Sequence, residues 1–304
     1  MKMITTNLDN NHKYILYELY SIHGDIKHYF HFFLGVFIPL ILEYIEYKKK
    51  YEYITFIIKD DVGPFFRILF ELPFDIKFQN FLINNSDLNI EKKYLIPLDT
   101  ILMNKKSLKW IKMKYADIFT NSICIEINKW FNQQINMYSF FIHPIYPIFD
   151  IVIIERKTNI SYKSTYAKAI DTHKFKNSFK TSGLERRSIL NHTEFVQCIK
   201  DYFPKKNVIN ISTEYMPIFE QYYIYNNAKL LIAQHGAGLS NIIFMQNKSS
   251  VIEIINKERL TENWFLELSK NCNNLNYNQY LTDEEMVNID LDKFKLFLDN
   301  GNFF

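Results

Sequence analysis

Cysteine is scarce in this chain, and the few residues present show no pairing pattern. Cys124, Cys198 and Cys272 stand far apart, without the spacing of a zinc site or of a disulfide framework. Such thiols favour a reducing compartment, and we expect a cytoplasmic protein. Net charge is small as well, at +3, and the lysines are spread along the chain, which argues against a nucleic-acid partner.

Long hydrophobic runs are also scarce. The first eleven residues are polar, and no signal peptide is visible. The apolar segment over residues 29–42 is shorter than the roughly 20 residues that a bilayer requires, and it contains His31 and Pro39. We therefore interpret this segment as part of a buried helix and expect no transmembrane segment.

The sequence shows neither internal repeats nor low-complexity tracts, whereas apolar residues are plentiful. They make up 48% of the chain and aromatic residues 17%, which excludes a disordered protein. A length of 304 residues suits one large domain or two of about 150 residues. The oligomeric state is not indicated, because the aromatic residues can fill a core as well as an interface.

Segments typical of strands and helices alternate in two blocks. The first block contains predicted helices over 25–50, kinked or divided at Pro39, and over 63–72, strands over 53–58 and 93–97, and two helical patterns within 105–138. The second contains predicted strands over 150–154, 207–211, 229–233 and 251–255, helices over 192–202 and 213–226, and a C-terminal helix within 283–304. Asn191 is the predicted N-cap of the helix over 192–202.

Two such blocks predict an α/β fold with two parallel-sheet domains that face each other. The proline-rich connector over 143–147 places the boundary between domains 1–145 and 146–304, with the C-terminal helix free to pack back on the first domain. Residues 157–185 form a polar stretch with little periodicity, typical of a flexible lid or an insertion.

Glycine is rare, with 7 residues in 304, yet Gly236 and Gly238 stand two positions apart. They follow the apolar run 229–234 and precede the apolar residues 242–245, an arrangement of strand, turn and helix start. Such a turn aims backbone N–H groups at an anion, and a side chain at either glycine would hold the backbone away from a phosphate. An ordinary tight turn is the alternative interpretation.

Other residues of the second block suit an anion as well. Arg156 follows the strand over 150–154, and His235 and Glu253 also lie at or near predicted strand ends. Ligands of open α/β sheets bind beyond the carboxyl ends of the strands, so we expect these residues to converge. Arginine can clamp a pyrophosphate through paired N–H donors, although a solvated surface position is the common alternative.

The order of these motifs resembles glycosyltransferase family 61. The family pattern combines an arginine after a strand, an Arg-x-Ile-x-Asn segment that opens a helix, a His-Gly-Ala-Gly-Leu-Ser-Asn block and a following Val-Ile-Glu. The chain carries all of them in order, with Arg187-Ser188-Ile189-Leu190-Asn191 as the second element and residues 235–241 as the third. A weaker N-terminal likeness aligns His31 with a histidine of the family pattern.

The resemblance implies a GT-B fold, in which two Rossmann-like domains enclose a cleft and the second domain holds the donor. It implies inverting transfer of a sugar from UDP-N-acetylglucosamine or UDP-xylose to a hydroxyl of a glycan or protein, without a metal or another cofactor. By family position, the expected donor-binding residues are Arg156, Arg187, Asn191, His235, Gly236, Ala237, Gly238, Leu239, Ser240, Asn241 and Glu253. Residues 236–241 would bind the diphosphate, Arg156 and Arg187 would neutralise it, and Glu253 would accept hydrogen bonds from the ribose.

Inverting transfer needs a general base for the acceptor hydroxyl, and in a GT-B arrangement the first domain would supply it. His31, Asp25 and Asp61 are the candidates, with His31 favoured by the family likeness. A histidine on an aromatic helix is more often a core residue. His28 and His31 lack a third metal ligand, and Asp290 belongs to an Asp-x-Asp spacing that we interpret as a solvated surface.

Two other functions remain open at this point. A catalytically inactive scaffold protein of the same fold would keep the glycine turn and bind a nucleotide sugar without a base. An epimerase or a dinucleotide enzyme is the third hypothesis. The chain lacks a Gly-x-Gly-x-x-Gly near its N-terminus and the acidic residue about 20 positions later, which counts against dinucleotide binding.

Overall fold

The computed structural model describes residues 11–19, 29–58, 65–78, 90–95, 101–103, 110–112, 119–142, 149–156, 187–213 and 216–304. The chain divides into two compact units, Met1–Tyr115 and Ala116–Phe304. This division precedes helix α5 (Asn121–Ile142), whereas the sequence placed the boundary after residue 145. Helix α5 belongs to the second unit because Asn128 donates to the carbonyl of Ile243 and its own carbonyl accepts from Tyr222.

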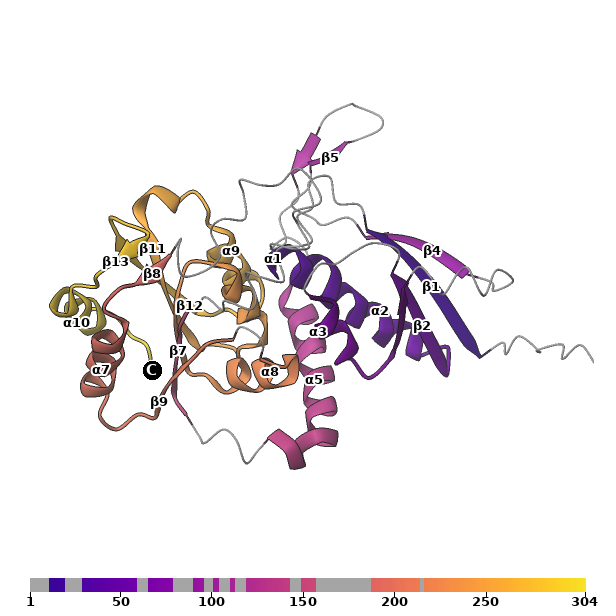
Figure 1. Cartoon of the computed structure of the whole chain (residues 1–304), viewed down its shortest axis with the longest axis horizontal. Helices are drawn as coiled ribbons and strands as arrows, with labels where there is room; N and C mark the ends of the chain where they lie inside the picture. The colour runs from indigo at the N-terminus through magenta and orange to yellow at the C-terminus, as the bar shows by residue number, and fades with distance from the viewer. Residues whose placement is uncertain are drawn as a thin grey trace, which may run out of the picture. The chain divides into compact units, whose positions relative to one another are not determined.

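A parallel sheet of four strands organises the first unit (Figure 1). Its order is β3 (Asp75–Phe78), β2 (Tyr53–Ile58), β1 (His12–Leu19) and β4 (Ile90–Leu95). Strand β1 is central, with Ile15 opposite Phe56 of β2 and Glu91 of β4. This strand order is consistent with a Rossmann-like domain. Helix α3 (Phe66–Phe70) joins β2 to β3, and β5 (Ile101–Met103) pairs antiparallel with β6 (Trp110–Lys112).

The helix after β1 changes its winding at Pro39. It begins as α1 (Tyr29–Phe32), widens into the π-helical segment η2 (Phe33–Phe37) and continues as α2 (Ile38–Lys48). Pro39 lies in the first turn of α2, where a residue without an N–H donor is tolerated. All five residues of η2 are buried, so the apolar run forms core, and the helix passes from π-helical to α-helical winding at Ile38, next to the predicted division at Pro39.

A parallel sheet of five strands organises the second unit. Its order is β12 (Asn276–Thr282), β11 (Ser250–Asn256), β10 (Leu230–Gln234), β7 (Ile151–Ile154) and β9 (Val208–Ile211). From β7 the chain goes first to β9 on one side and then to β10 on the other. The strand order therefore reverses between β7 and β10, the place where open α/β sheets bind their ligands.

Burial explains which strands the sequence could reveal. Every residue of β11 is buried, as is nearly all of β10, in keeping with the continuous apolar runs of a covered parallel sheet. The edge strand β12 is largely polar and only partly buried. Strands β7, β9, β10 and β11 are thus confirmed with small differences at their ends, whereas β12 was not predicted.

Helices cover both faces of this second sheet (Figure 1). On one face α7 (His192–Tyr202) and α10 (Leu291–Asp299) contribute Phe195, Ile199, Phe294 and Leu298 to a core with alternate residues of β7, β10 and β11. The C-terminal helix therefore packs on the sheet of its own unit. On the other face lie α5, α8 (Ile218–Asn227), α9 (Trp264–Asn271) and the 3₁₀ helix η6 (Ala237–Phe244).

Three other predictions need correction. Of the residues described within 105–138, those from Asn121 onward belong to a single helix, α5, and Trp110–Lys112 pairs as a strand with β5. Helix α8 begins at Ile218 and not at residue 213, since Pro217 forms its N-cap. Strand β1 and helix α9 were not predicted at all. The predicted strand over 93–97 is observed as β4, which begins and ends earlier in the sequence.

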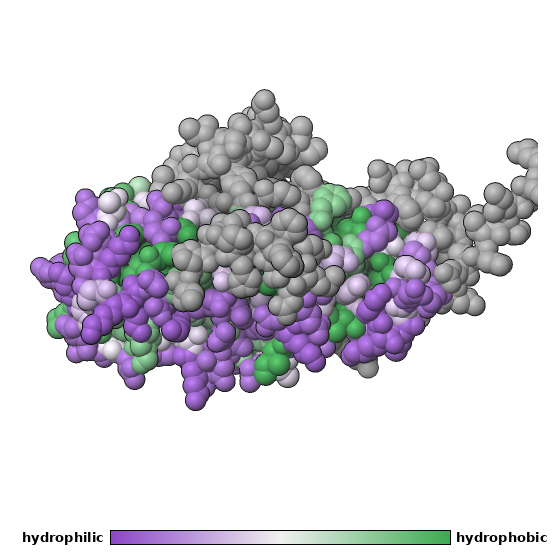
Figure 2. Space-filling model, turned by 90° about the horizontal axis from the view of Figure 1, so that it is seen from below, coloured by the Kyte–Doolittle hydropathy of each residue, from purple (hydrophilic) through white to green (hydrophobic). Residues whose placement is uncertain are grey.

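The described surface is largely polar on the face that Figure 2 shows, where hydrophobic side chains form small separate areas. Within the ranges that the structure describes, no helix combines the length and the apolar character needed to cross a bilayer.

Candidate functional site

The glycine turn, residues 235–241, leaves the carboxyl end of β10 and enters helix η6. The predicted strand, turn and helix start are thus present, although the helix is of the 3₁₀ type. Gly236 is its N-cap, and the N–H of Leu239 donates to the Gly236 carbonyl over 2.9 Å. The N–H groups of Ala237 and Gly238 precede this bond, in the first turn, where a helix offers them no carbonyl of its own.

Arg156 follows β7 and lies directly against Gly236. A Cβ atom built on Gly236 would come within 1.8 Å of Nη2 of Arg156, far inside van der Waals contact. A glycine is therefore needed at position 236 for the guanidinium to occupy this place. Since β7 and β10 are neighbours, the contact lies where the strand order reverses.

His235 is buried and held by two carboxylates from different segments. Its Nδ1 lies 2.6 Å from Oε1 of Glu253, and its Nε2 lies 3.2 Å from Oε2 of Glu262. The other oxygen of Glu253 accepts from Gln279 of β12 over 2.7 Å. Carboxylates only accept hydrogen bonds, so both contacts are satisfied when the imidazole carries two protons and a positive charge.

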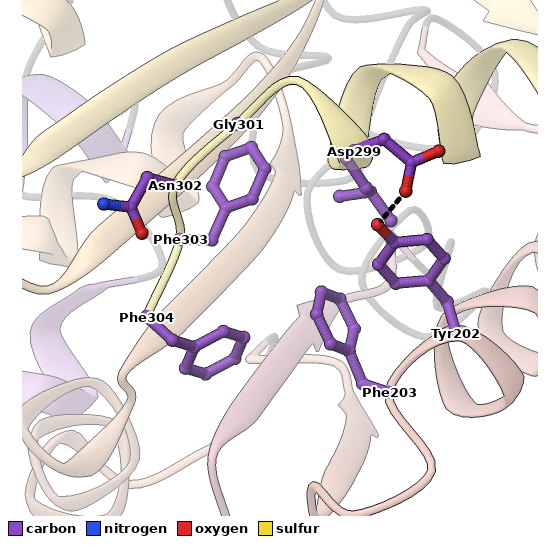
Figure 3. Close-up of a pocket in the computed structure, with 8 residues that line it drawn as sticks. Tyr202, Phe203, Asp299, Gly301, Asn302, Phe303 and Phe304 are labelled. Carbon is purple, nitrogen blue, oxygen red and sulfur yellow. Dashed lines mark hydrogen bonds between the residues drawn. The ribbon is translucent and has the colours of Figure 1, made fainter.

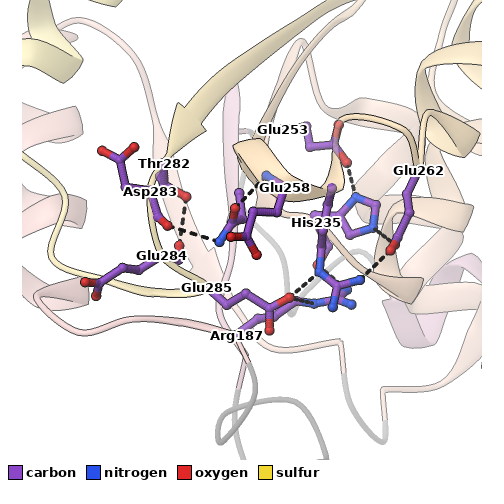
Figure 4. Close-up of polar contacts among 11 residues, drawn as sticks. Arg187, His235, Glu253, Glu258, Glu262, Thr282, Asp283, Glu284 and Glu285 are labelled. Atoms are coloured by element: carbon purple, nitrogen blue, oxygen red, sulfur yellow. Dashed lines mark hydrogen bonds and ion pairs between the residues drawn. The ribbon is translucent and has the colours of Figure 1, made fainter.

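An ionic network continues from this histidine through four further side chains (Figure 4). Glu262 also binds Nη1 of Arg259 over 2.6 Å, and Arg259 in turn binds Glu285. Nε of Arg187 lies 3.7 Å from the same carboxylate of Glu285. Nη1 of Arg187 donates to the backbone carbonyl of His235 over 3.1 Å, which closes the network.

All members of this network except Arg187 follow the carboxyl ends of neighbouring strands. His235 follows β10, Arg259 and Glu262 follow β11, and Glu285 follows β12. Arg187 reaches the same edge because β8 (Ser188–Ile189) pairs with β13 (Met286–Val287). Arg259, Glu262 and Glu285 were not predicted from the sequence. Charged residues that come shortly after the predicted strand over 251–255 would have been the signal for the first two.

The inner side of the glycine turn is fixed by neutral hydrogen bonds. Asn241 donates to the side chain of Gln221 over 2.7 Å, and both residues are buried. The hydroxyl of Tyr225 donates to the Gly238 carbonyl over 3.0 Å. Burial raises the pKa of Tyr225, which therefore stays protonated. Leu239 and Ser240 are buried as well, so this side of the turn packs inward.

Two of the predicted donor-binding residues differ from expectation, Glu253 in its position along the strand and Asn191 in the partner of its side chain. Glu253 does not lie at a strand end: β11 extends to Asn256 because its pairing with β12 continues that far, and Glu253 is 1% exposed. Asn191 stands at the N-cap of α7, but its side chain makes no capping hydrogen bond. It binds the backbone of Ile289 instead, accepting from the N–H over 2.8 Å and donating to the carbonyl over 2.9 Å.

The candidate bases of the first unit are less fully described. His31 belongs to α1. Asp25 and Asp61 lie outside the described residues. The segment over 157–185 lies outside them too.

A pocket of about 280 Å³ lies in the second unit, at the other ends of the strands from the glycine turn (Figure 3). It is lined by Tyr202, Phe203, Leu298, Asp299, Gly301, Asn302, Phe303 and Phe304. Ser250, at the amino end of β11, donates to the carbonyl of Phe303, which places the pocket near the amino ends of the strands. It is therefore separate from the glycine turn.

No cluster of three or more metal-ligating side chains suited to an ion occurs among the described residues. Asp290, of the Asp-x-Asp spacing, caps helix α10 by accepting from the N–H of Lys293.

Two of the three cysteines, which are far apart in the sequence, are neighbours in the fold. Cys272 and Cys124 are both buried, and burial together with the hydrogen bond to Cys124 raises the pKa of Cys272.

Comparison with known families gives one match. The family profile described as Glycosyltransferase 61 matches residues 29–252, well over half of the chain, and includes the glycine turn. No protein of curated function matches the sequence.

Proposed function

Because the chain belongs to glycosyltransferase family 61 and is therefore a glycosyltransferase, we propose that its donor is a UDP-sugar bound at the glycine turn. UDP-N-acetylglucosamine and UDP-xylose are the proposed donors, and the acceptor is a hydroxyl group of a glycan or a protein. The transfer inverts the anomeric centre and needs no metal. The two units act as the halves of a GT-B fold.

The observation that supports this proposal is the convergence of arginines on the peptide between His235 and Gly236. Arg156 lies against Gly236, and Arg187 donates to the carbonyl of His235. The N–H groups of the first turn of η6 start at the same place. A nucleotide sugar releases its diphosphate with increasing negative charge, which guanidinium groups and helix N–H donors stabilise without a metal.

The packing of the turn divides its residues between two roles. Ala237 and Gly238 are partly exposed and supply N–H groups to the diphosphate, whereas Leu239, Ser240 and Asn241 support the turn from within. Glu253 acts on His235 and not on a ribose, since both of its oxygens already accept hydrogen bonds inside the sheet. His235 in turn is held behind the turn between the carboxylates of Glu253 and Glu262.

Binding of UDP to the purified protein is the first test. A ligand that binds only the folded state raises the melting temperature with its concentration, so UDP is titrated with and without manganese. Arg156→Ala should weaken UDP binding about tenfold or more, a loss of about 1.4 kcal/mol. Lys205→Ala, which removes an exposed positive charge near the amino ends of the strands, is the matched control. Equal affinities of the two variants would contradict the proposed site.

The general base comes, in this proposal, from the first unit. His31→Ala, Asp25→Asn and Asp61→Asn are compared for UDP binding and for turnover with an acceptor. Loss of a general base lowers kcat by about 10²–10⁴-fold and leaves donor affinity unchanged. The variant with that signature identifies the base. If all three retain full turnover, the base lies elsewhere in the chain.

A cytoplasmic location is proposed from the cysteine usage alone. Fractionation of cells that express the tagged chain tests it, and recovery of the chain with secreted or membrane material would contradict it.

A further inference from the structure

We propose that Glu262 is an internal anion of the donor site, which the diphosphate of the nucleotide sugar displaces from His235 and Arg259. This inference rests on the proposed function and assigns two further residues to it. Arg259 becomes a diphosphate-binding residue, and Glu262 becomes a competitor that occupies the site in the absence of donor.

The position of Glu262 resembles that of a bound ligand. Its carboxylate bridges two groups that are positively charged or able to be so, with Oε2 at 3.2 Å from Nε2 of His235 and Oε1 at 2.6 Å from Nη1 of Arg259. A phosphate oxygen makes the same kind of contact with an imidazolium and a guanidinium. The carboxylate thus fills the place where an anion would bind.

Glu262 is also the member of the network best able to leave. Its side chain is 39% exposed, whereas that of Glu253 is 1% exposed and that of Glu285 is 28% exposed. It belongs to the short connection between the 3₁₀ turn η7 (Lys257–Arg259) and α9, so its side chain can turn toward solvent without disturbing a strand. Glu253, in the middle of β11, has no such freedom.

Charge favours the exchange. A glutamate carries one negative charge, and the diphosphate of a nucleotide sugar carries two. The diphosphate can also use Arg156 and the N–H groups of the glycine turn, which Glu262 is not seen to bind. Displacement of Glu262 then leaves His235 bound to Glu253 on one side and open to the donor on the other. The internal contact lowers the apparent donor affinity, because binding must first break it.

Isothermal titration with UDP tests this inference through the sign of the change. Glu262→Gln keeps the shape of the side chain and removes its charge, so we expect UDP to bind about three- to thirtyfold more tightly than to the wild type. Glu258→Gln is the matched control. It removes a charge from the adjacent exposed turn, away from the hydrogen bonds of His235, and should change the affinity less than twofold.

The double variant tests the role of Arg259. Arg259→Ala should weaken UDP binding, and adding Glu262→Gln to it should restore less affinity than the same change does in the wild type, since one of the released partners is missing. Far-ultraviolet circular dichroism and the melting temperature show that each variant folds.

The outcomes separate the two levels of the proposal. If the wild type binds UDP and Glu262→Gln binds it equally or more weakly, Glu262 orients the site and displacement is wrong, while the proposed function stands. If neither the wild type nor any variant binds UDP, the proposed donor site fails, and the inference fails with it.

Discussion

The guanidinium of Arg156 takes up the space that a side chain at Gly236 would need. Nη2 of Arg156 would lie 1.8 Å from a Cβ atom at this position, and Cζ would lie 2.7 Å away. The two residues follow neighbouring strands, β7 and β10, although 80 positions separate them in the sequence. The glycine at the start of the turn thus serves the placement of an arginine as well as the approach of a ligand.

Gly236→Ala should therefore weaken donor binding more than it weakens the fold. The new methyl group meets the end of a flexible side chain, which can move away, so the guanidinium is displaced from the glycine turn, and the φ angle of +159° at position 236 adds backbone strain. We expect UDP affinity to fall about tenfold or more, equivalent to about 1.4 kcal/mol, as measured by isothermal titration. Gly238→Ala is the control, because the nearest atom to its new methyl group is the Tyr225 hydroxyl at 3.8 Å. A similar loss in both variants would show that glycine is needed for the backbone to come close to the ligand, and not for the placement of Arg156.

Much of the second unit could be predicted because its central strands are buried on both faces. Strands β10 and β11 appear as apolar runs that end in motif residues, which reveals a parallel sheet and the edge that carries the site. Strand β12 escaped prediction because an edge strand needs no apolar run, and its Gln279 could not be connected with Glu253.

The ionic network shows where sequence reasoning ends. Arg187 and His235 belong to short motifs that suggest an anion site. Arg259 and Glu262 come from the connection after β11 and Glu285 from the one after β12, and only the strand order brings these two connections together. Their partnership depends on distances across the sheet, which no local pattern encodes. Glu253 was placed correctly in the motif but given a wrong position in its strand, since strand ends depend on pairing with a neighbour.

Asn191→Ala should affect stability and leave donor affinity unchanged. The variant loses two hydrogen bonds and leaves the partly buried N–H and carbonyl of Ile289 without these partners. The expected cost is about 1–3 kcal/mol in the free energy of unfolding. Urea unfolding measures this loss. Asn227→Ala removes an exposed asparagine that binds only within its own helix and should cost less than about 0.5 kcal/mol. Weaker UDP binding by Asn191→Ala with unchanged stability would return Asn191 to the donor site.

Asp150 makes a contribution to the stability of the second unit that depends on pH. Its carboxylate accepts from Lys229 over 2.7 Å and from the N–H of Asn207 over 3.2 Å. The bond to Lys229 and, to a smaller extent, the bond to Asn207 lower the pKa of Asp150 below 3.8. The stabilisation is complete above the unfolded-state pKa and is lost as the pH falls through the lower folded-state value.

Asp150→Asn should thus be less stable than the wild type at pH 7, by about 1 kcal/mol, the usual worth of such a hydrogen bond. The difference should shrink as the pH falls below 3.8. Urea unfolding at pH 7 and at pH 3 measures both values. Asp292→Asn, which removes an exposed carboxylate paired with Lys295, is the control and should change stability little at either pH. An advantage of the wild type that is as large at pH 3 as at pH 7 would show that shape, and not charge, makes Asp150 stabilising.

Thiol reactivity tests the packing of α5 against α9. Cys124, near the start of α5, and Cys272, at the end of α9, are both fully buried, and burial raises the pKa of Cys272. A raised pKa reduces the thiolate fraction of Cys272, and burial keeps reagents away from both thiols, so neither residue should react with a disulfide reagent in the native protein at pH 8. Cys198, which is 6% exposed, should react first, and all three thiols should react after unfolding in guanidinium chloride. A Cys198→Ser variant isolates the pair. Rapid labelling of this variant under native conditions would mean that α5 separates readily from the second sheet, and that the division of the chain before α5 does not hold in solution.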